Sequence, residues 1–460
     1  MTKSINTREI VLDLLLEWEK GAVFSHRLIR DVLNKYNYLS GQEKGFIKRL
    51  AEGTIERQIE LDYRLEQVSS VPVHKMKPLI RSLLRMSVYQ ILYMDSVPDA
   101  AAVSEAVKLA GKRKFQNLKG FVNGVLRSAA KQKEAQVYPD PGQDMTAYLS
   151  VRYSMPVWLV EKWLEDYGRE NTERILEGML QARPVTIRFA GGMTESQRED
   201  WKQQVRDLGV KVRSHPYLPY AAELEGAEGI GSLPGYQEGN FAVQDVSSML
   251  AVEAAGVKPG DFVLDVCAAP GGKTMLAAEK VMPDGRVTAR DVSESKVDLL
   301  RENLERMDLH HVKVEVRDAT LPDESLKGKA DVVLADVPCS GLGVIGRKKD
   351  IKYRVSKEQL GELEKLQKAI LKQAVSYVRE NGILLYSTCT INKQENQEMV
   401  QWICREFSFQ PEDMSTFLPR DIEEESVKSG MLQLLPGVHD SDGFFFARLR
   451  KKAVRGSDRC

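Results

Sequence analysis

Apolar residues recur at helical spacing through the first third of the chain. Between about residues 7 and 133 they fall three or four positions apart, and no alternating strand pattern interrupts them. Two such groups are Ile10, Leu14, Leu15 and Trp18, and Leu79, Leu83, Leu84 and Tyr89. Ser40 followed by Glu43 is typical of a capping box at a helix N-terminus. The pattern predicts an all-helical domain over residues 1–140.

The periodicity breaks at residues 138–142, which are rich in Pro and Gly. Two helical stretches, a strand, a helix and a second strand then predict a small α+β module over 141–235. Strands alternate with helices over 236–452, which predicts a mostly parallel, doubly wound, Rossmann-like sheet. An apolar run at 444–450 is expected to close this sheet as an antiparallel strand, and residues 453–460 are expected to form a flexible tail.

Composition narrows the class of protein. The 460 residues are 42% hydrophobic and 29% charged, which is typical of globular proteins. The five cysteines are odd in number, widely spaced and without a CxxC pair, so neither a disulfide framework nor a metal site is expected. No apolar stretch approaches membrane-spanning length, and the first 20 residues lack a secretory signal pattern. We therefore expect a cytoplasmic protein that makes no membrane contact.

The formal net charge of zero conceals an uneven distribution. Residues 1–135 carry 23 Lys and Arg against 15 Asp and Glu, a net charge of +8. Residues 111–133 contain seven basic side chains and no acidic one: Lys112, Arg113, Lys114, Lys119, Arg127, Lys131 and Lys133. A solvated helix face and an RNA-contact face are about equally consistent with this run, and the positive excess slightly favours RNA.

Acidic residues and cysteines follow the strands of the predicted doubly wound sheet. Ligands of such sheets bind beyond the carboxyl ends of the strands. The residues at these ends are Asp265, Asp291, Asp318 and Asp336, with Cys267, Cys339 and Cys389. One such acid is more often a cap or turn residue, but four at one edge favour a binding site. Asp291 lies about 20 residues beyond the glycine loop, where nucleotide-binding folds place the acid that binds ribose hydroxyls.

The loop after the first of these strands is rich in small residues. It reads Cys267, Ala268, Ala269, Pro270, Gly271, Gly272, Lys273. A phosphate-binding P-loop would require glycine at position 267, and the spacing is not GxGxxG either. Because both phosphate signatures are absent, we expect a nucleoside cofactor without phosphates, of which S-adenosylmethionine is the common one. Gly271 and Gly272 would let the backbone approach this ligand closely.

Cys339 and Cys389 end different strands at one sheet edge, which favours a chemical role over an inert buried one. A thiolate that adds to C6 of cytosine makes C5 nucleophilic, so that C5 can accept a methyl group; loss of the C5 proton and elimination of the thiol then restore the base. Asp336 is placed to hold the base through N3 or the exocyclic amine. The spacing leaves both cysteines as equal candidates for the attacking thiol.

A basic segment follows Cys339. Residues 341–354 include five basic side chains and one acidic side chain: Arg347, Lys348, Lys349, Lys352 and Arg354, with Asp350. Beside the predicted site, we expect this segment to contact a nucleic-acid backbone. A target base would have to leave its stack to reach the cysteines.

Five motifs carry a family resemblance: FAVQDVSSML, DVCAAPGGKT, ADVPCSGLGV, YSTCTINKQEN and DGFFFARL. Together they resemble the RsmB (Sun/Fmu) family of bacterial 16S rRNA cytosine-C5 methyltransferases. The helical region is similar to the NusB-type RNA-binding domain of that family, and the middle module resembles its small RNA-binding domain. The resemblance therefore implies an S-adenosylmethionine-dependent enzyme with 16S rRNA as its partner, free or in a pre-ribosomal particle, and we expect a monomer.

The resemblance also implies roles for individual residues. Cys389, in the Thr-Cys motif, matches the family nucleophile, and Cys339 matches the cysteine that assists product release. Residues 267–273, Asp291, Asp318 and Asp336 match the cofactor contacts, and Asp336 also the contact to the base. An alternative interpretation is a non-catalytic RNA-binding or assembly factor with a vestigial methyltransferase fold. The intact glycine loop, acids and cysteines argue against it, and Cys267 argues against a P-loop NTPase.

Overall fold

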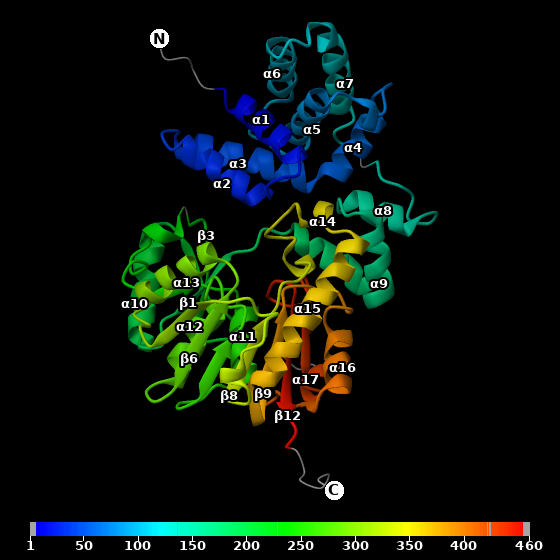
Figure 1. Cartoon of the computed structure of the whole chain (residues 1–460). Coiled ribbons are helices and arrows are strands. Elements are labelled where there is room, and N and C mark those ends of the chain that lie inside the picture. The colour runs from blue at the N-terminus through cyan, green and yellow to red at the C-terminus, as the bar shows by residue number, and fades with distance from the viewer. Residues whose placement is uncertain (1–5, 136, 228, 421, 423–424, 454–460) are drawn as a thin grey trace. The chain divides into compact units, whose positions relative to one another are not determined.

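The computed structural model describes residues 6–135, 137–227, 229–420, 422 and 425–453. The chain divides into two compact units, coloured by residue number in Figure 1. The first comprises residues 1–180 and 347–354, and the second comprises 181–346 and 355–460. The sequence predicts boundaries at 140 and 235 instead. The first unit extends to residue 180 because two further helices, within residues 145–180, belong to it. Apart from residue 453, the expected tail at 453–460 lies outside the described residues.

The described part of the first unit is helical, as the apolar spacing predicts. Its α-helices are α1 (Thr7–Glu19), α2 (Ser25–Lys35), α3 (Gly41–Glu56), α4 (Gln58–Glu66), α5 (Pro78–Tyr93), α6 (Asp99–Lys112), α7 (Lys119–Lys131), α8 (Met145–Arg152), α9 (Val157–Leu180) and the short α14 (Ile351–Arg354). Helix α5 is central, since it packs against α1, α3, α4, α6 and α7. Helix α8 packs against α4 and α9, which explains why the unit extends beyond residue 140.

Local sequence signals fix several helix ends. The Ser40 hydroxyl accepts a hydrogen bond from the Glu43 backbone N–H, and the Glu43 carboxylate accepts one from the Ser40 backbone N–H, so the predicted capping box opens α3. Pro78 occupies the first position of α5, where a missing N–H costs nothing. Gly168 has a non-helical conformation and divides α9 into two helical stretches, as the sequence pattern indicates.

Asp350 anchors residues 347–354 in the first unit. Its side chain is fully buried and accepts hydrogen bonds from the Trp18 indole Nε1 (3.2 Å) and from the backbone N–H and hydroxyl of Ser25 (2.8 Å each). It also accepts one from Arg354 Nε (3.0 Å). Four donors from three residues therefore compensate for the desolvation of this carboxylate.

Three of the five basic residues of the segment after Cys339 are engaged in protein contacts. The buried Lys352 ammonium donates to the backbone carbonyl of Glu56 (2.7 Å), and Lys349 pairs with the Glu56 carboxylate (2.5 Å). Arg354 donates to the carbonyl of Gly21 (2.6 Å). The expectation that this segment contacts nucleic acid is therefore wrong for the buried Lys352, whereas for Lys349 and Arg354, which pair with the first unit but stay partly exposed, it remains a prediction.

The basic run at 111–133 is partly neutralised by neighbouring helices. Lys112 and Arg113 pair with Glu9 on α1 (2.5 and 3.3 Å), and Lys133 lies 3.7 Å from Asp99. Lys114, Arg127 and Lys131 are exposed. The run thus combines surface ion pairs with exposed cations, and it agrees with both interpretations of the sequence.

A small antiparallel sheet begins the second unit. Its strands are β1 (Val185–Phe189), β2 (Lys211–Ser214), β3 (Ala221–Glu225) and β4 (Phe241–Val243), in the order β2-β3-β1-β4, with α10 (Glu195–Asp207) packed beside them. The sequence pattern predicts β1, α10 and β2 but neither β3 nor β4. Strand β4 belongs to this sheet through its pairing with β1, although it lies within the expected catalytic region.

The large sheet contains eight strands in the described residues. They are β5 (Phe262–Asp265), β6 (Arg286–Asp291), β7 (Val312–Val316), β8 (Ala330–Asp336), β9 (Val378–Thr388), β10 (Phe409–Pro411), β11 (Met431–Leu434) and β12 (Phe444–Lys451). The order is β10-β12-β9-β8-β5-β6-β7, with β11 also paired to β12. Strands β9, β8, β5, β6 and β7 are parallel, and β12 pairs antiparallel with β9, as predicted for the closing strand.

Helices cover both faces of this sheet. Helices α11 (Val246–Ala255), α12 (Gly272–Val281) and α13 (Glu294–Arg306) pack on one face, and α15 (Lys357–Tyr377) and α16 (Gln397–Glu406) pack on the other. A short α17 (Glu425–Lys428) precedes β11. Consecutive residues of β5 face opposite sides, with Val263 in one apolar cluster and Leu264 in the other. Burial on both faces explains the nearly continuous apolar strands of the sequence.

We expect Asp350→Ala to destabilise the first unit by about 3 kcal/mol, because it leaves several buried donors without an acceptor. Hydrogen exchange of the α1 and α2 amides should detect the loss as faster exchange. Asp31→Ala, an exposed substitution on α2, is the control and should change stability by less than about 0.5 kcal/mol. Unchanged exchange in the Asp350 variant would contradict this account of the buried carboxylate.

Candidate active site

The carboxyl ends of the parallel strands form one edge of the large sheet. The register pairs Asp265 at the end of β5 with Leu334 of β8, and Asp336 at the end of β8 with Ser387 of β9. Asp291 is the last residue of β6. Three of the four predicted acids therefore stand at adjacent strand ends, and Asp318 lies two residues beyond the end of β7.

The loop between β5 and α12 is held by β6. The Ala268 N–H donates to the carbonyl of Arg290 (2.8 Å), and the Ala269 N–H donates to the Asp291 carboxylate (3.2 Å). Gly271 has φ +113°, and a Cβ there would lie 2.6 Å from Leu300. The glycine is thus required by its backbone angle and by the close approach of α13, and the loop enters α12 with a defined path.

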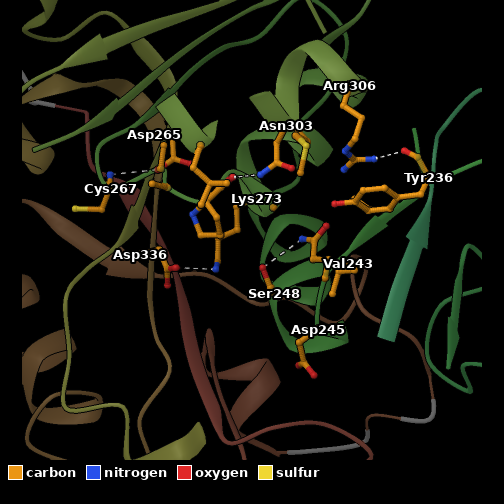
Figure 2. A pocket seen from close by; sticks show the side chains of 18 residues that line it. Tyr236, Val243, Asp245, Ser248, Asp265, Cys267, Lys273, Asn303, Arg306 and Asp336 are labelled. Atoms are coloured by element: carbon orange, nitrogen blue, oxygen red, sulfur yellow. Dashed lines mark hydrogen bonds and ion pairs between the residues drawn. The ribbon is translucent and has the colours of Figure 1, made fainter. Parts of the chain in front are cut away.

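A cavity of about 380 Å³ opens beside this loop. Figure 2 shows Asp265, Cys267, Lys273 and Asp336 on one side of it, and Tyr236, Asn303 and Arg306 on the other. Of the predicted site residues it is lined by Asp265, Cys267, Ala268, Ala269, Pro270, Gly272, Lys273 and Asp336. Gly271, Asp291, Asp318, Cys339 and Cys389 are not among the residues that line it.

Two carboxylates at the cavity have different environments. Asp265 is buried, accepts a hydrogen bond from the Thr274 hydroxyl (2.7 Å), and has its pKa raised to about 7 by burial. Asp336 is about one-third exposed and forms an ion pair with Lys273 Nζ (2.8 Å), while the Ser387 hydroxyl donates to its other oxygen (2.8 Å). Asp336 is therefore oriented by two donors and still reaches the cavity.

Asp291 and Asp318 make local contacts. Besides the Ala269 N–H, Asp291 accepts from the N–H of Val292 (2.8 Å) and pairs with Lys296 (3.2 Å). Asp318 accepts from the hydroxyl (2.7 Å) and backbone N–H (2.8 Å) of Thr320, and these hydrogen bonds lower the pKa of Asp318. Asp318 thus has the turn-forming role that a lone strand-end acid commonly has.

The two cysteines of the Pro-Cys and Thr-Cys motifs lie together. Cys339 Sγ and Cys389 Sγ are 3.3 Å apart, and each side chain is partly exposed. The hydrogen bond with Cys389 and burial raise the pKa of Cys339 well above its usual value. Cys267 belongs to the cavity wall instead, where burial raises its pKa. The pair combines a thiol that resists ionisation with a second thiol in hydrogen-bonding range.

Other residues at the cavity were not assigned by sequence reasoning. Arg306 lies over the Tyr236 ring (4.2 Å) and donates to the Tyr236 carbonyl (2.9 Å), and Asn303 donates to the Pro270 carbonyl (3.0 Å). Gln244 follows β4 and donates to the Ser248 hydroxyl (3.2 Å). Gln244 and Ser248 lie in the FAVQDVSSML motif. This motif carries the family resemblance, but residue spacing alone assigned no role to either residue. Tyr236, Asn303 and Arg306 lie outside the five motifs that carry the resemblance.

Neither a metal centre nor a membrane span is found among the described residues. No group of three or more His, Cys, Asp and Glu side chains within them is arranged to hold a metal ion. No described helix combines the length and apolarity needed to cross a membrane.

Family models match three regions of the chain. The NusB family matches residues 5–131, the ferredoxin-like domain of RsmF/B-like methyltransferases matches 155–230, and the model for the 16S rRNA methyltransferase RsmB/F matches 253–450. With the mixed sheet and its carboxyl-edge cavity, these matches define a Rossmann-like methyltransferase that carries an N-terminal NusB domain and a small ferredoxin-like module.

Similarity to one curated relative extends over nearly the whole chain. The Bacillus subtilis protein named "Probable ribosomal RNA small subunit methyltransferase B" is 36% identical over 98% of this chain and all of its own length. The chain therefore belongs to the RsmB family of 16S rRNA methyltransferases, and its activity is methylation of small-subunit ribosomal RNA.

Solved structures share the fold. The crystal structure of PH0851 matches with a TM-score of 0.79 and 24% identity, over 97% of this chain and 99% of that one. NSun6 from Pyrococcus horikoshii, solved with SFG, matches with a TM-score of 0.58 and 22% identity, over 65% of this chain and 98% of its own. At these identities the likeness concerns the fold alone.

Proposed function

We propose that this protein methylates C5 of one cytidine in 16S rRNA through a covalent adduct between Cys389 and C6 of the base. The observation that carries the proposal is the pair of cysteines from two strand ends, with their sulfurs 3.3 Å apart. C5 of a pyrimidine is too weak a nucleophile to take a methyl group unaided, so a thiol at this edge has a chemical purpose. The Thr-Cys and Pro-Cys motifs support the assignment of Cys389 to attack and Cys339 to release.

The two thiols suit successive steps. Cys389 attacks as a thiolate, forms the bond to C6 and leaves C5 electron-rich. After C5 has accepted the methyl group, its proton must leave to a base, and the electrons of that C–H bond then expel the Cys389 thiolate. Cys339, whose pKa is raised by its hydrogen bond to Cys389 and by burial, supplies a neutral S–H next to the attacking sulfur. That S–H can donate a hydrogen bond to the Cys389 thiolate before attack, and again when the thiolate leaves C6.

Asp336, oriented by Lys273 and Ser387, would hold the cytosine. Asp336 ends β8 three residues before Cys339, and Ser387 and Lys273 orient its carboxylate. A carboxylate accepts hydrogens from the exocyclic amine of cytosine, whereas uracil has a carbonyl at that position. This preference favours cytidine as the modified nucleotide.

The cavity fits S-adenosylmethionine by its donor set. Gly272 brings backbone rather than side chain to its wall, and the Asp265 and Asp336 carboxylates at the strand ends match the cationic and hydroxyl groups of this cofactor. Residues 267–273, Asp291 and Asp336 would hold it, with Asp291 on the ribose. Asp318 is included in this proposal on the family resemblance alone, since its carboxylate forms a turn with Thr320 and does not line the cavity. When bound, S-adenosylmethionine supplies the electrophilic methyl group.

The partner in this proposal is 16S rRNA, free or in a pre-ribosomal particle, bound by a monomer. The alternative interpretation, a non-catalytic assembly factor, predicts no transfer of label from tritiated S-adenosylmethionine to RNA. The retained cysteine pair and the oriented Asp336 disfavour it, since an RNA-binding scaffold needs neither.

Bisulfite sequencing tests the modified position. We expect 16S rRNA from cells that lack this protein to lose one cytosine protected from conversion, and the purified wild-type protein to restore it. Tritium incorporation without a protected cytosine would exclude C5 of cytosine as the target.

Variants of the cysteines should separate their roles. Cys389→Ala should lower methyl transfer by about three orders of magnitude or more, because the covalent step is lost. Cys339→Ala should leave a protein–RNA adduct that survives denaturing electrophoresis, because release is impaired. Cys404→Ala is the matched control, since Cys404 lies on α16 away from the pair. An active Cys389 variant would reverse the assignment.

Asp291→Asn tests the ribose contact. Loss of a charged hydrogen bond should weaken S-adenosylmethionine binding about 10- to 100-fold, as measured by calorimetric titration. Asp284→Asn, an exposed carboxylate just before β6, serves as the control and should bind as the wild type does. Equal affinities for both variants would remove Asp291 from the cofactor site.

A further inference from the structure

Glu395 is a buried carboxylate in the loop between β9 and α16. It is 1% exposed, and its two oxygens accept four hydrogen bonds. One oxygen accepts from the Ser340 N–H (2.9 Å) and the Gln367 amide (2.9 Å), and the other accepts from the Ser340 hydroxyl (2.6 Å) and the Asn392 amide (2.9 Å). None of these four donors is a cation, so the hydrogen bonds that this carboxylate accepts within the described part of the chain come from neutral dipoles.

The donors come from the segments that carry the two reactive cysteines. Ser340 follows Cys339 directly, and Asn392 lies three residues beyond Cys389. The Ser340 hydroxyl also lies 2.8 Å from the hydroxyl of Thr390, the residue after Cys389. Through Ser340 and Asn392, a single side chain connects the Pro-Cys loop with the Thr-Cys loop.

Glu395 is itself held in place. The Tyr386 hydroxyl donates to its backbone carbonyl, and Gln367 of α15 donates both to its carboxylate and to the carbonyl of Pro338 (3.0 Å), the residue before Cys339. Both the backbone and the side chain of Glu395 are therefore fixed by neighbours on β9 and α15.

A carboxylate is the side chain that this arrangement requires. It offers acceptor positions on both oxygens and no hydrogen, whereas the amide of glutamine would turn two hydrogens toward the donors on one side. A charge buried among neutral donors costs stability that an apolar side chain would not cost. Such a cost beside a pair of reactive cysteines points to a functional reason for the carboxylate.

We propose that Glu395 is a positioning residue for methyl transfer, which holds the Cys339 and Cys389 loops so that the two sulfurs stay in contact. This proposal rests on the covalent function proposed above. Glu395 acts through Ser340 and Asn392 and does not itself touch the substrate. Its charge has a second consequence, since it contributes to the raised pKa of Cys339 after the hydrogen bond to Cys389, burial and the charge of Cys389.

Glu395→Gln tests the proposal through kinetics. We expect kcat for methyl transfer to RNA to fall about 10- to 100-fold, while KM for RNA and the affinity for S-adenosylmethionine change less than about threefold. Glu398→Gln is the matched control, because Glu398 is exposed, lies three residues further along the chain and loses the same charge. A kcat equal to that of the control would overturn the proposal.

A second measurement tests whether the two sulfurs stay adjacent, and it does not require methyl transfer. Phenylarsine oxide bridges two adjacent thiols, forming two As–S bonds and releasing water. We expect the wild type to bind one equivalent through Cys339 and Cys389, as identified by peptide mass, and Glu395→Gln to bind at least tenfold more weakly. Wild-type affinity in the Gln variant would overturn the proposal. This result does not depend on which RNA atom is methylated, so it is separable from failure of the proposed function.

Asn392→Ala keeps the test decisive if the Gln variant does not fold. It removes one of the four donors and retains the carboxylate. We expect a smaller fall in both kcat and arsenical affinity, with a circular dichroism spectrum like that of the wild type. A folded Asn392 variant with both values unchanged would count against the proposal.

Discussion

The register between β8 and β9 is the constraint on which the active edge depends. Asp336 pairs with Ser387, so the chain leaves β8 toward Cys339 and leaves β9 toward Cys389 at neighbouring points. Successive β9 residues face opposite cores, Leu384 toward α15 and Leu385 toward α11. A shift by one residue would exchange these faces and bury the wrong side chains on both sides of the sheet. The apolar cores therefore determine the spacing of the cysteines.

Buried carboxylates then fix the loops that the sheet leaves undetermined. Asp265 binds the Thr274 hydroxyl at the start of α12, Glu395 connects the two cysteine loops, and Asp350 holds residues 347–354 within the first unit. Each joins chain segments that are separated in sequence. Each also carries a desolvation cost, since a carboxylate surrounded by protein loses its water. The same hydrogen bonds that compensate for this cost leave each loop a single favourable geometry.

The sequence predicted the parts of the site that depend on local pattern. Buried parallel strands appear as apolar runs, so the pattern alone places their ends, and with them Asp265, Asp336 and Cys389, on one edge of the sheet. Strand β4 could not be predicted, because three residues give no periodicity and its pairing with β1 joins segments more than 50 residues apart. Glu395 lies in a polar run, Lys-Gln-Glu-Asn, that is typical of solvent-exposed loops. Only its distant partners make it a buried residue.

The basic segment after Cys339 also has contacts that the sequence alone does not predict. Because part of it belongs to the first unit, it changes which residues enter the net charge of that unit. Lys349, Lys352 and Arg354 look like phosphate contacts in sequence, yet each already bonds to a carboxylate or a carbonyl of the first unit. Counted over residues 1–180 and 347–354, the first unit has 32 Lys and Arg against 24 Asp and Glu. The net charge is again +8, because residues 136–180 add 4 basic and 8 acidic side chains while residues 347–354 add 5 basic and 1 acidic side chain. A polyanion responds to the field of this whole unit, so the positive excess that favours RNA persists even though Lys349, Lys352 and Arg354 are buried or paired.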